Sequence, residues 1–156
     1  DAGPIVVLGA GGGARAVVAA LADAGAPEIR LVNRNADRAV ALAAEYGGPV
    51  RAVDWSRRAE ILDDAAMVVN TTTQGMTGQP GLDLALDRLP VAALVSDIVY
   101  IPLETPLLAA ARARGNRTVN GLGMLINQAR PAFQAWFGIL PDVTAELRAR
   151  LEASIG

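Results

Sequence analysis

Residues 5–14 have the sequence IVVLGAGGGA, an apolar run that leads directly into a glycine-rich turn. The β-branched run is typical of a strand that is buried on both faces of a parallel sheet. The turn fits the pattern G-x-G-x-x-A, in which Gly9 allows the tight turn, Gly11 lets the backbone approach a pyrophosphate, and Ala14 lets the next helix pack closely. That helix directs free N–H groups and its positive dipole end toward the phosphates. This stretch predicts a dinucleotide-binding site, with a purely structural glycine turn as the alternative.

Strand-like and helix-like segments alternate along the rest of the chain. We expect strands at residues 5–8, 29–32, 50–53, 67–69, 93–98 and 117–119. We expect helices at residues 14–24, 36–46, 56–62, 105–115, 121–137 and 144–153, with a helical turn within 84–89. This alternation predicts an α/β fold of the Rossmann type, a doubly wound, mostly parallel six-stranded sheet with helices on both faces. Residues 74–82 hold three glycines and one proline and read as a loop over a site.

Length and composition fit one globular domain. The 156 residues are 52% hydrophobic and 19% charged, which argues against disorder. We expect a Rossmann core with a returning helix over 1–138 and a C-terminal helix over 139–156. No apolar run approaches the ~18 residues of a membrane span, and no signal peptide is visible. The net charge of −2 offers nucleic acid no attractive field, and the lack of cysteine fits a cytoplasmic protein.

The basic residues are unusual. All 14 are arginine, and the chain has neither lysine nor histidine. A compositional bias of the source genome would explain the excess of arginine without any functional meaning. Either way, no His or Lys can exchange protons near neutral pH, so we expect no catalytic residue in this chain. No acidic cluster suggests a metal site.

The second predicted strand ends in a turn that favours NADP over NAD. In NAD-binding domains an acid at this place accepts the ribose 2′-OH. Here the turn is Asn33, Arg34 and Asn35, and the nearest acid is Asp37, already inside the next helix. Arg34 and Arg38, one helical turn apart, would attract a 2′-phosphate, and the two Asn amides add donors. The alternative is that both arginines are merely solvated.

Five ordered motifs between residues 5 and 138 resemble those of shikimate dehydrogenases. They are GAGGGARA at 9–16, NRN at 33–35 with Arg38, NTTTQGM at 70–76, DIVY at 97–100 with Pro102 and TPLL at 105–108, and NGLGML at 120–125 with Gln128. Two departures from the family pattern are Asn120, where Asp is usual, and Asn35, where Thr is usual. We expect Asn120 to keep hydrogen bonds that order the turn, without the charge.

The resemblance implies an oxidoreductase that reduces 3-dehydroshikimate with NADPH, on the route to chorismate and the aromatic amino acids. It also implies that an N-terminal domain carries the catalytic Lys–Asp pair and most of the substrate pocket. That domain and its lysine are absent from these 156 residues. We therefore expect the cofactor-binding half of the enzyme, which binds NADP but does not turn over substrate by itself.

The resemblance also assigns roles to individual residues. The pyrophosphate would lie on Gly9, Ala10, Gly11, Gly12, Gly13 and Ala14, and the 2′-phosphate on Asn33, Arg34, Asn35 and Arg38. Thr72 would lie along the cofactor, Ile98 and Gly121 would flank the nicotinamide near Met124, and Tyr100 and Gln128 would reach the substrate. As alternatives, Tyr100 could be an aromatic at the core edge, Gln128 a surface amide, and Gly121 only a helix-start glycine.

Other functions share part of this pattern. The chain could be the NADP domain of a quinate or aminoshikimate dehydrogenase, because the contacts that separate these substrates lie in the other domain. A glutamyl-tRNA reductase has a similar loop and Asn-Arg motif, but residues 120–128 disfavour it. A free-standing NADP-binding regulatory module is the alternative outside the enzymes.

Overall fold

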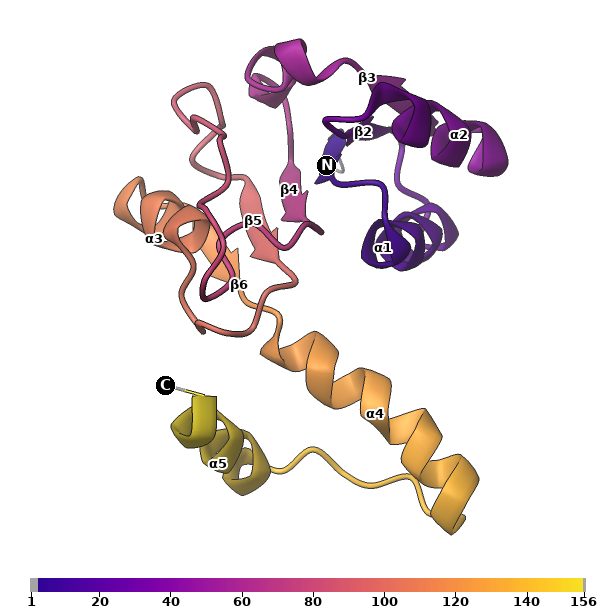
Figure 1. Ribbon diagram of the computed structural model, residues 1–156, viewed down its shortest axis with the longest axis vertical. Helices are drawn as coiled ribbons and strands as arrows, with labels where there is room; N and C mark the ends of the chain where they lie inside the picture. Colours follow the sequence, from indigo (N-terminus) through magenta and orange to yellow (C-terminus); the bar gives the residue numbers. More distant parts are fainter. Residues whose placement is uncertain (1–2, 156) are drawn as a thin grey trace.

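The computed structural model describes residues 3–155 and forms one six-stranded sheet (Figure 1). The strands are β1 (Ile5–Leu8), β2 (Ile29–Val32), β3 (Val50–Val53), β4 (Met67–Asn70), β5 (Leu94–Asp97) and β6 (Arg117–Val119). Their order is β3-β2-β1-β4-β5-β6, and all five pairings are parallel. The strand order reverses at β1 and β4, the switch point where doubly wound sheets bind ligands. The predicted fold class is confirmed.

The helices agree with the prediction except in the connection between β3 and β5. They are α1 (Gly12–Asp23), α2 (Ala36–Tyr46), α3 (Pro106–Ala113), α4 (Leu122–Phe137) and α5 (Ala145–Ile155). The helix predicted at 56–62 is wrong, because two short 3-10 turns, η1 (Trp55–Arg57) and η2 (Glu60–Leu62), stand there. Residues 84–89 form no helix but a turn closed by a hydrogen bond from Leu89 N to Leu86 O (2.9 Å). So short a segment gains little from an α-helix, and the turn instead places Leu86 and Leu89 in the core.

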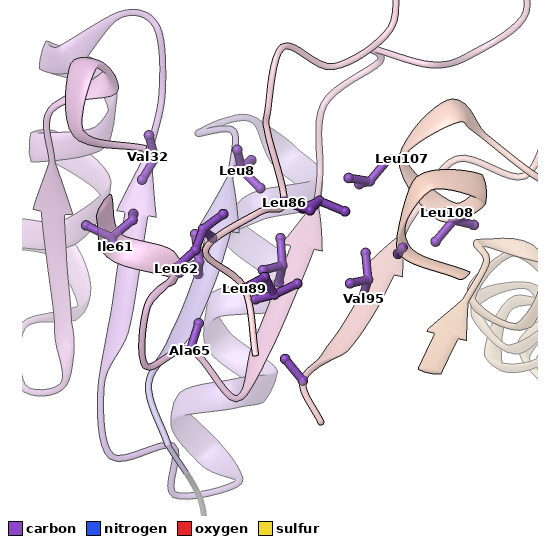
Figure 2. Packing of buried hydrophobic residues seen from close by; sticks show 14 residues of the cluster. Leu8, Val32, Ile61, Leu62, Ala65, Leu86, Leu89, Val95, Leu107 and Leu108 are labelled. Carbon is purple, nitrogen blue, oxygen red and sulfur yellow. The ribbon is translucent and has the colours of Figure 1, made fainter. Parts of the chain in front are cut away.

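Side chains alternate between two apolar clusters, one on each face of the sheet. Val7 of β1 joins α1 and α2 in one cluster, while Val6 and Leu8 join the cluster on the opposite face. Figure 2 shows this second cluster, in which Leu62 of η2, the turn leucines and α3 cover the strands. Both faces are therefore covered, and the carboxyl ends of the strands are left free for a ligand.

Helix α4 leaves the sheet instead of covering it. Only Leu122 and Ile126, in its first turns, are buried, and Figure 1 shows the helix running away from the strands. Seven large apolar residues at and beyond its far end are exposed: Phe133, Trp136, Phe137, Ile139, Leu140, Val143 and Leu147. Helix α4 is thus anchored to the sheet by its first turns.

No helix within residues 3–155 is long and apolar enough to cross a membrane. No group of three or more His, Cys, Asp or Glu side chains in the same range could hold a metal ion.

Candidate cofactor site

The loops that follow the first four strands enclose a crevice of about 400 Å³ at the carboxyl edge of the sheet. This volume lies in the range typical of small-molecule sites. The lining residues are 9–13 after β1, Asn33 and Arg34 after β2, Trp55 after β3, and 71–74 after β4. The crevice therefore sits at the switch point between β1 and β4, where the sequence predicts the dinucleotide.

The glycines of the loop differ in what surrounds them. Gly9 has φ +110°, and a Cβ there would lie 2.5 Å from Thr71 Oγ1. A Cβ on Gly13 would lie 2.7 Å from Ile98 Cδ1, so this glycine lets α1 approach the end of β5. No atom lies within 4 Å of a Cβ built on Gly11 or Gly12, so these two present bare backbone to open space. Ala14 is fully buried and packs against the sheet instead of lining the crevice.

The start of α1 has no side-chain cap. Its N-cap residue is Gly11, in extended conformation, and no side chain accepts a hydrogen bond from the first-turn N–H groups. These donors remain available to an anion, and the helix dipole favours negative charge at the same place. The loop thus offers the arrangement that a pyrophosphate requires.

The turn after β2 brings one of the two predicted arginines to the crevice. Arg34 lines it, whereas Arg38 is exposed and does not. The ion pairs formed within residues 3–155 use other arginines, so both guanidinium groups are without a carboxylate partner there. Asn33 lines the crevice and donates from Nδ2 to Asn35 O (2.8 Å). Asn35 caps α2 by accepting from Arg38 N (3.2 Å), so its side-chain oxygen orders the turn instead of facing a ligand.

A buried carboxylate lies behind the crevice. Asp97, at the end of β5, is 1% exposed and accepts three hydrogen bonds. Its Oδ1 accepts from Asn70 Nδ2 and Val99 N (3.0 Å each), and its Oδ2 accepts from Thr105 Oγ1 (2.7 Å). Burial raises the pKa of Asp97 above its ordinary value, and the three hydrogen bonds partly oppose this by favouring the charged form.

The network continues from Asp97 to the crevice wall. Asn70 Oδ1 accepts from the backbone N (3.0 Å) and the hydroxyl (2.7 Å) of Thr72. Thr72 Oγ1 in turn accepts from Gln74 N (3.1 Å), and Asn70 Nδ2 also donates to Gln74 O (3.1 Å). The loop that carries Thr72 is therefore ordered from behind by a chain of directed hydrogen bonds.

The residues predicted for the nicotinamide and the substrate form a second group, which does not line the crevice. Gly121 packs against Ile98 and Val99, the two residues that follow β5. A Cβ on Gly121 would overlap the Ile98 carbonyl, and the Gly121 N–H donates to Val99 O (3.0 Å). Met124 and Gln128 are exposed on α4, one helical turn apart, and Tyr100 is half-buried. Ile98 joins the two groups, because it contacts the first turn of α1 at Gly13 and the start of α4 at Gly121.

Asn120 orders the turn before α4, as predicted. Its Oδ1 accepts from Leu122 N (3.3 Å), and its Nδ2 donates to Leu103 O (3.2 Å). An ionised aspartate could make only the first of these bonds, because it has no donor. The amide therefore adds a contact to the loop after β5.

Sequence reasoning missed four crevice residues, namely Trp55, Thr71, Thr73 and Gln74. Thr71 and Thr73 flank the predicted Thr72, so the loop itself was found. Trp55 comes directly after β3, and the rule that ligands lie at the carboxyl ends of parallel strands could have found it. That rule needs only the position of the strand end.

Two family models match the chain. The one described as shikimate / quinate 5-dehydrogenase covers residues 2–77, and the one described as shikimate 5′-dehydrogenase C-terminal domain covers residues 121–150. Among curated relatives, shikimate dehydrogenase (NADP(+)) of Paramagnetospirillum magneticum is 64% identical over 94% of this chain. The protein of the same name from Dinoroseobacter shibae is 57% identical over 95% of it.

Solved structures agree with these matches. A quinate dehydrogenase from Corynebacterium glutamicum, in complex with NAD, superposes with a TM-score of 0.89 at 35% identity, over 98% of this chain and 56% of its own. A shikimate 5-dehydrogenase from Thermus thermophilus, in complex with NADP(H) and shikimate, gives 0.79 at 38% identity, over 98% and 54%. The chain spans about half the length of its curated relatives, 53% for the two named above. On the evidence of motifs, fold and these matches, the chain belongs to the shikimate/quinate dehydrogenase family.

Proposed function

We propose that this chain binds NADP(H) and forms the cofactor-binding half of a shikimate dehydrogenase. The observation that carries the proposal is Arg34, which lines the crevice at the end of β2 where an NAD-binding domain has a carboxylate. The names of the curated relatives support the same cofactor. We also propose that residues 1–156 are a single cofactor-binding domain, with the returning helix ending near residue 138.

The described residues fit this cofactor. Residues 9–13 would hold the pyrophosphate against the start of α1, and Arg34 with Asn33 would hold the 2′-phosphate, within reach of Arg38. Thr72 would lie along the cofactor, held by Asn70. Ile98, Gly121 and Met124 would flank the nicotinamide, which supplies a hydride in the reduced cofactor. The sheet order supports this assignment, because Ile98 follows β5, which lies three strands away from β2 and Arg34.

The proposed substrate is 3-dehydroshikimate, and Tyr100 and Gln128 would contact it from this chain. In the reaction a hydride passes from NADPH to the carbonyl carbon and a proton to the carbonyl oxygen, which gives shikimate and NADP⁺. The sequence has no His or Lys that could supply this proton near neutral pH. We propose that a group in the part of the relatives that this chain does not span supplies it.

A second candidate is a quinate dehydrogenase that uses NAD. The observation in its favour is the TM-score of 0.89 with a quinate dehydrogenase in complex with NAD. The two candidates differ at the end of β2, because NAD has no 2′-phosphate for Arg34 to bind. Cofactor preference is therefore the first property to measure.

Replacing Arg34 by alanine should weaken NADP binding about 10- to 100-fold, because a hydrogen bond to a charged group contributes about 1.5–3 kcal/mol. NAD binding should change less than about twofold, since its ribose carries a neutral hydroxyl. Isothermal titration calorimetry of the wild type and Arg34→Ala with both cofactors measures this. Arg117→Ala is the matched control, because Arg117 is exposed and does not line the crevice. Equal losses for NADP and NAD would contradict the assignment.

The 156 residues by themselves should bind NADPH and leave shikimate unoxidised in the presence of NADP. The reason is that proton transfer needs a group that this sequence does not contain. Absorbance of the reduced nicotinamide measures turnover, with the Paramagnetospirillum magneticum relative assayed in parallel as the positive control. Measurable oxidation by this chain alone would show that the proton-transfer group lies within it.

A further inference from the structure

Trp55 is a wall of the crevice that none of the roles above explains. It lies two residues beyond Val53, the last residue of β3, and Arg34 lies two residues beyond Val32, the last residue of β2. Val32 and Val53 are register partners in the β2–β3 pairing. The sheet thus brings Arg34 and Trp55 to equivalent places on neighbouring strands, and both line the crevice.

The indole ring of Trp55 is held in place from outside the crevice. The guanidinium carbon of Arg58 lies 4.8 Å from the ring centroid, a cation–π contact. Arg58 is itself fixed, since it donates to Trp55 O (3.1 Å), to Asp83 O (2.9 Å) and to Asp83 Oδ2 (2.6 Å). Trp55 also packs against the apolar cluster drawn in Figure 2. Trp55, a residue of the crevice wall, is therefore preorganised.

The chemistry of this corner is a flat apolar ring beside an arginine without a carboxylate partner among residues 3–155. A ligand that is complementary to both the ring and the arginine carries an aromatic base and a phosphate on the same ribose. We propose that Trp55 is the platform on which the adenine ring of bound NADP(H) stacks, with the 2′-phosphate directed to Arg34. This inference rests on the proposed cofactor and adds a residue that determines its affinity. Because Arg58 and Asp83 already fix the ring, little side-chain entropy is lost on binding.

Binding of an adenine half-ligand tests the role of Trp55 directly. Trp55→Ala should raise the Kd for adenosine 2′,5′-bisphosphate about tenfold, because stacking of a base on an aromatic ring contributes about 1–3 kcal/mol. Trp55→Phe keeps an aromatic face and should stay within about threefold of the wild type. Trp136→Ala is the matched control, since this tryptophan is 77% exposed on α4 and does not line the crevice. An unchanged Kd in Trp55→Ala would overturn the inference.

Tryptophan fluorescence gives a second readout that does not require Trp55 to be removed. The chain has two tryptophans, so Trp136→Phe leaves Trp55 as the only one. Adenosine 2′,5′-bisphosphate should quench the emission of this variant, and nicotinamide mononucleotide, which has no adenine, should not. Binding of the bisphosphate in the calorimeter without any quenching would overturn the inference.

The outcomes separate this inference from the proposed function. If the wild type binds neither NADP nor adenosine 2′,5′-bisphosphate, both fail. If the wild type and Trp55→Ala bind both ligands with the same Kd, only the platform fails. Far-ultraviolet circular dichroism and thermal melting of each variant show whether it is folded. If Trp55→Ala does not fold, Trp55→Phe and the single-tryptophan variant Trp136→Phe test the role of Trp55 instead.

Discussion

Replacing Gly121 by alanine should lower the free energy of unfolding by about 3 kcal/mol or more, the upper end of the range for overpacking. A Cβ at this position would overlap the carbonyl carbon and oxygen of Ile98 and lie 2.8 Å from Val99 O. These are backbone atoms at the end of a paired strand, so they cannot rotate away as a side chain could. The start of α4 would have to move off the sheet, together with the hydrogen bond from Gly121 N to Val99 O.

Gly123→Ala is the matched control in the same helix. No atom lies within 4 Å of a Cβ at Gly123, the second residue of α4. Alanine there should leave the free energy of unfolding within about 0.5 kcal/mol of the wild type, because the added methyl group meets no neighbouring atom. Urea unfolding of the wild type and both variants measures the difference. Similar stabilities of Gly121→Ala and the wild type would mean that the contact with Ile98 is not as close as described.

Removal of the buried carboxylate should have an effect of the same size. Asp97→Ala leaves two buried donors without an acceptor, Val99 N and Thr105 Oγ1, and Asn70 Nδ2 keeps only its bond to Gln74 O. Each orphaned donor costs about 1–3 kcal/mol, so a loss of about 2–6 kcal/mol is expected. Because Asn70 also holds Thr72, NADP affinity should fall even under conditions where the variant is folded. Wild-type stability and affinity in Asp97→Ala would show that the network does not order the crevice.

Asp97 should also give stability a dependence on pH. Burial raises its pKa above the ordinary value of 3.8, so above that pH the folded state holds the proton more tightly than the unfolded state. The unfolded state then binds fewer protons, and the contribution of Asp97 to stability falls as pH rises through this window. Asp97→Asn cannot titrate, so the stability of the wild type relative to Asp97→Asn should be greater at pH 4 than at pH 7. Glu28 and Asp64 have lowered pKa values and act in the opposite direction, but they are common to both proteins and cancel in the difference.

Local features of the sequence predicted most of the fold. The strand Ile5–Leu8 and its glycine turn are contiguous in the sequence. One short stretch therefore contains both the apolar run that predicts the buried strand and the glycines that predict the loop. Thr105 and Pro106 likewise predict a helix start, and the structure confirms it, because Thr105 Oγ1 accepts from Leu108 N (3.3 Å). These signals depend on neighbours in the chain and need no knowledge of strand pairing.

The site was predicted less completely, because part of it depends on which strands become neighbours. Trp55 and Arg34 are 21 positions apart, and only the β2–β3 register brings them to one corner. Asn70 and Asp97 meet for the same reason, since they are register partners of β4 and β5. The assignment of Asn35 to the phosphate stays a prediction: its side-chain oxygen caps α2, and its Nδ2 is the atom that would donate to a phosphate.

The anchoring of α4 at one end has a mechanical consequence. A helix of 16 residues is about 24 Å long, and a tilt of about 10° at its root moves its tip by about 4 Å. The pivot is the contact between Gly121 and Ile98, beside the place proposed for the nicotinamide. The far end carries Phe133 and Trp136, so a small rotation at the pivot becomes a displacement of exposed aromatic rings. A tilt at the start of α4 would therefore be amplified at its far end, where the displacement would be large enough to break or make a packing contact.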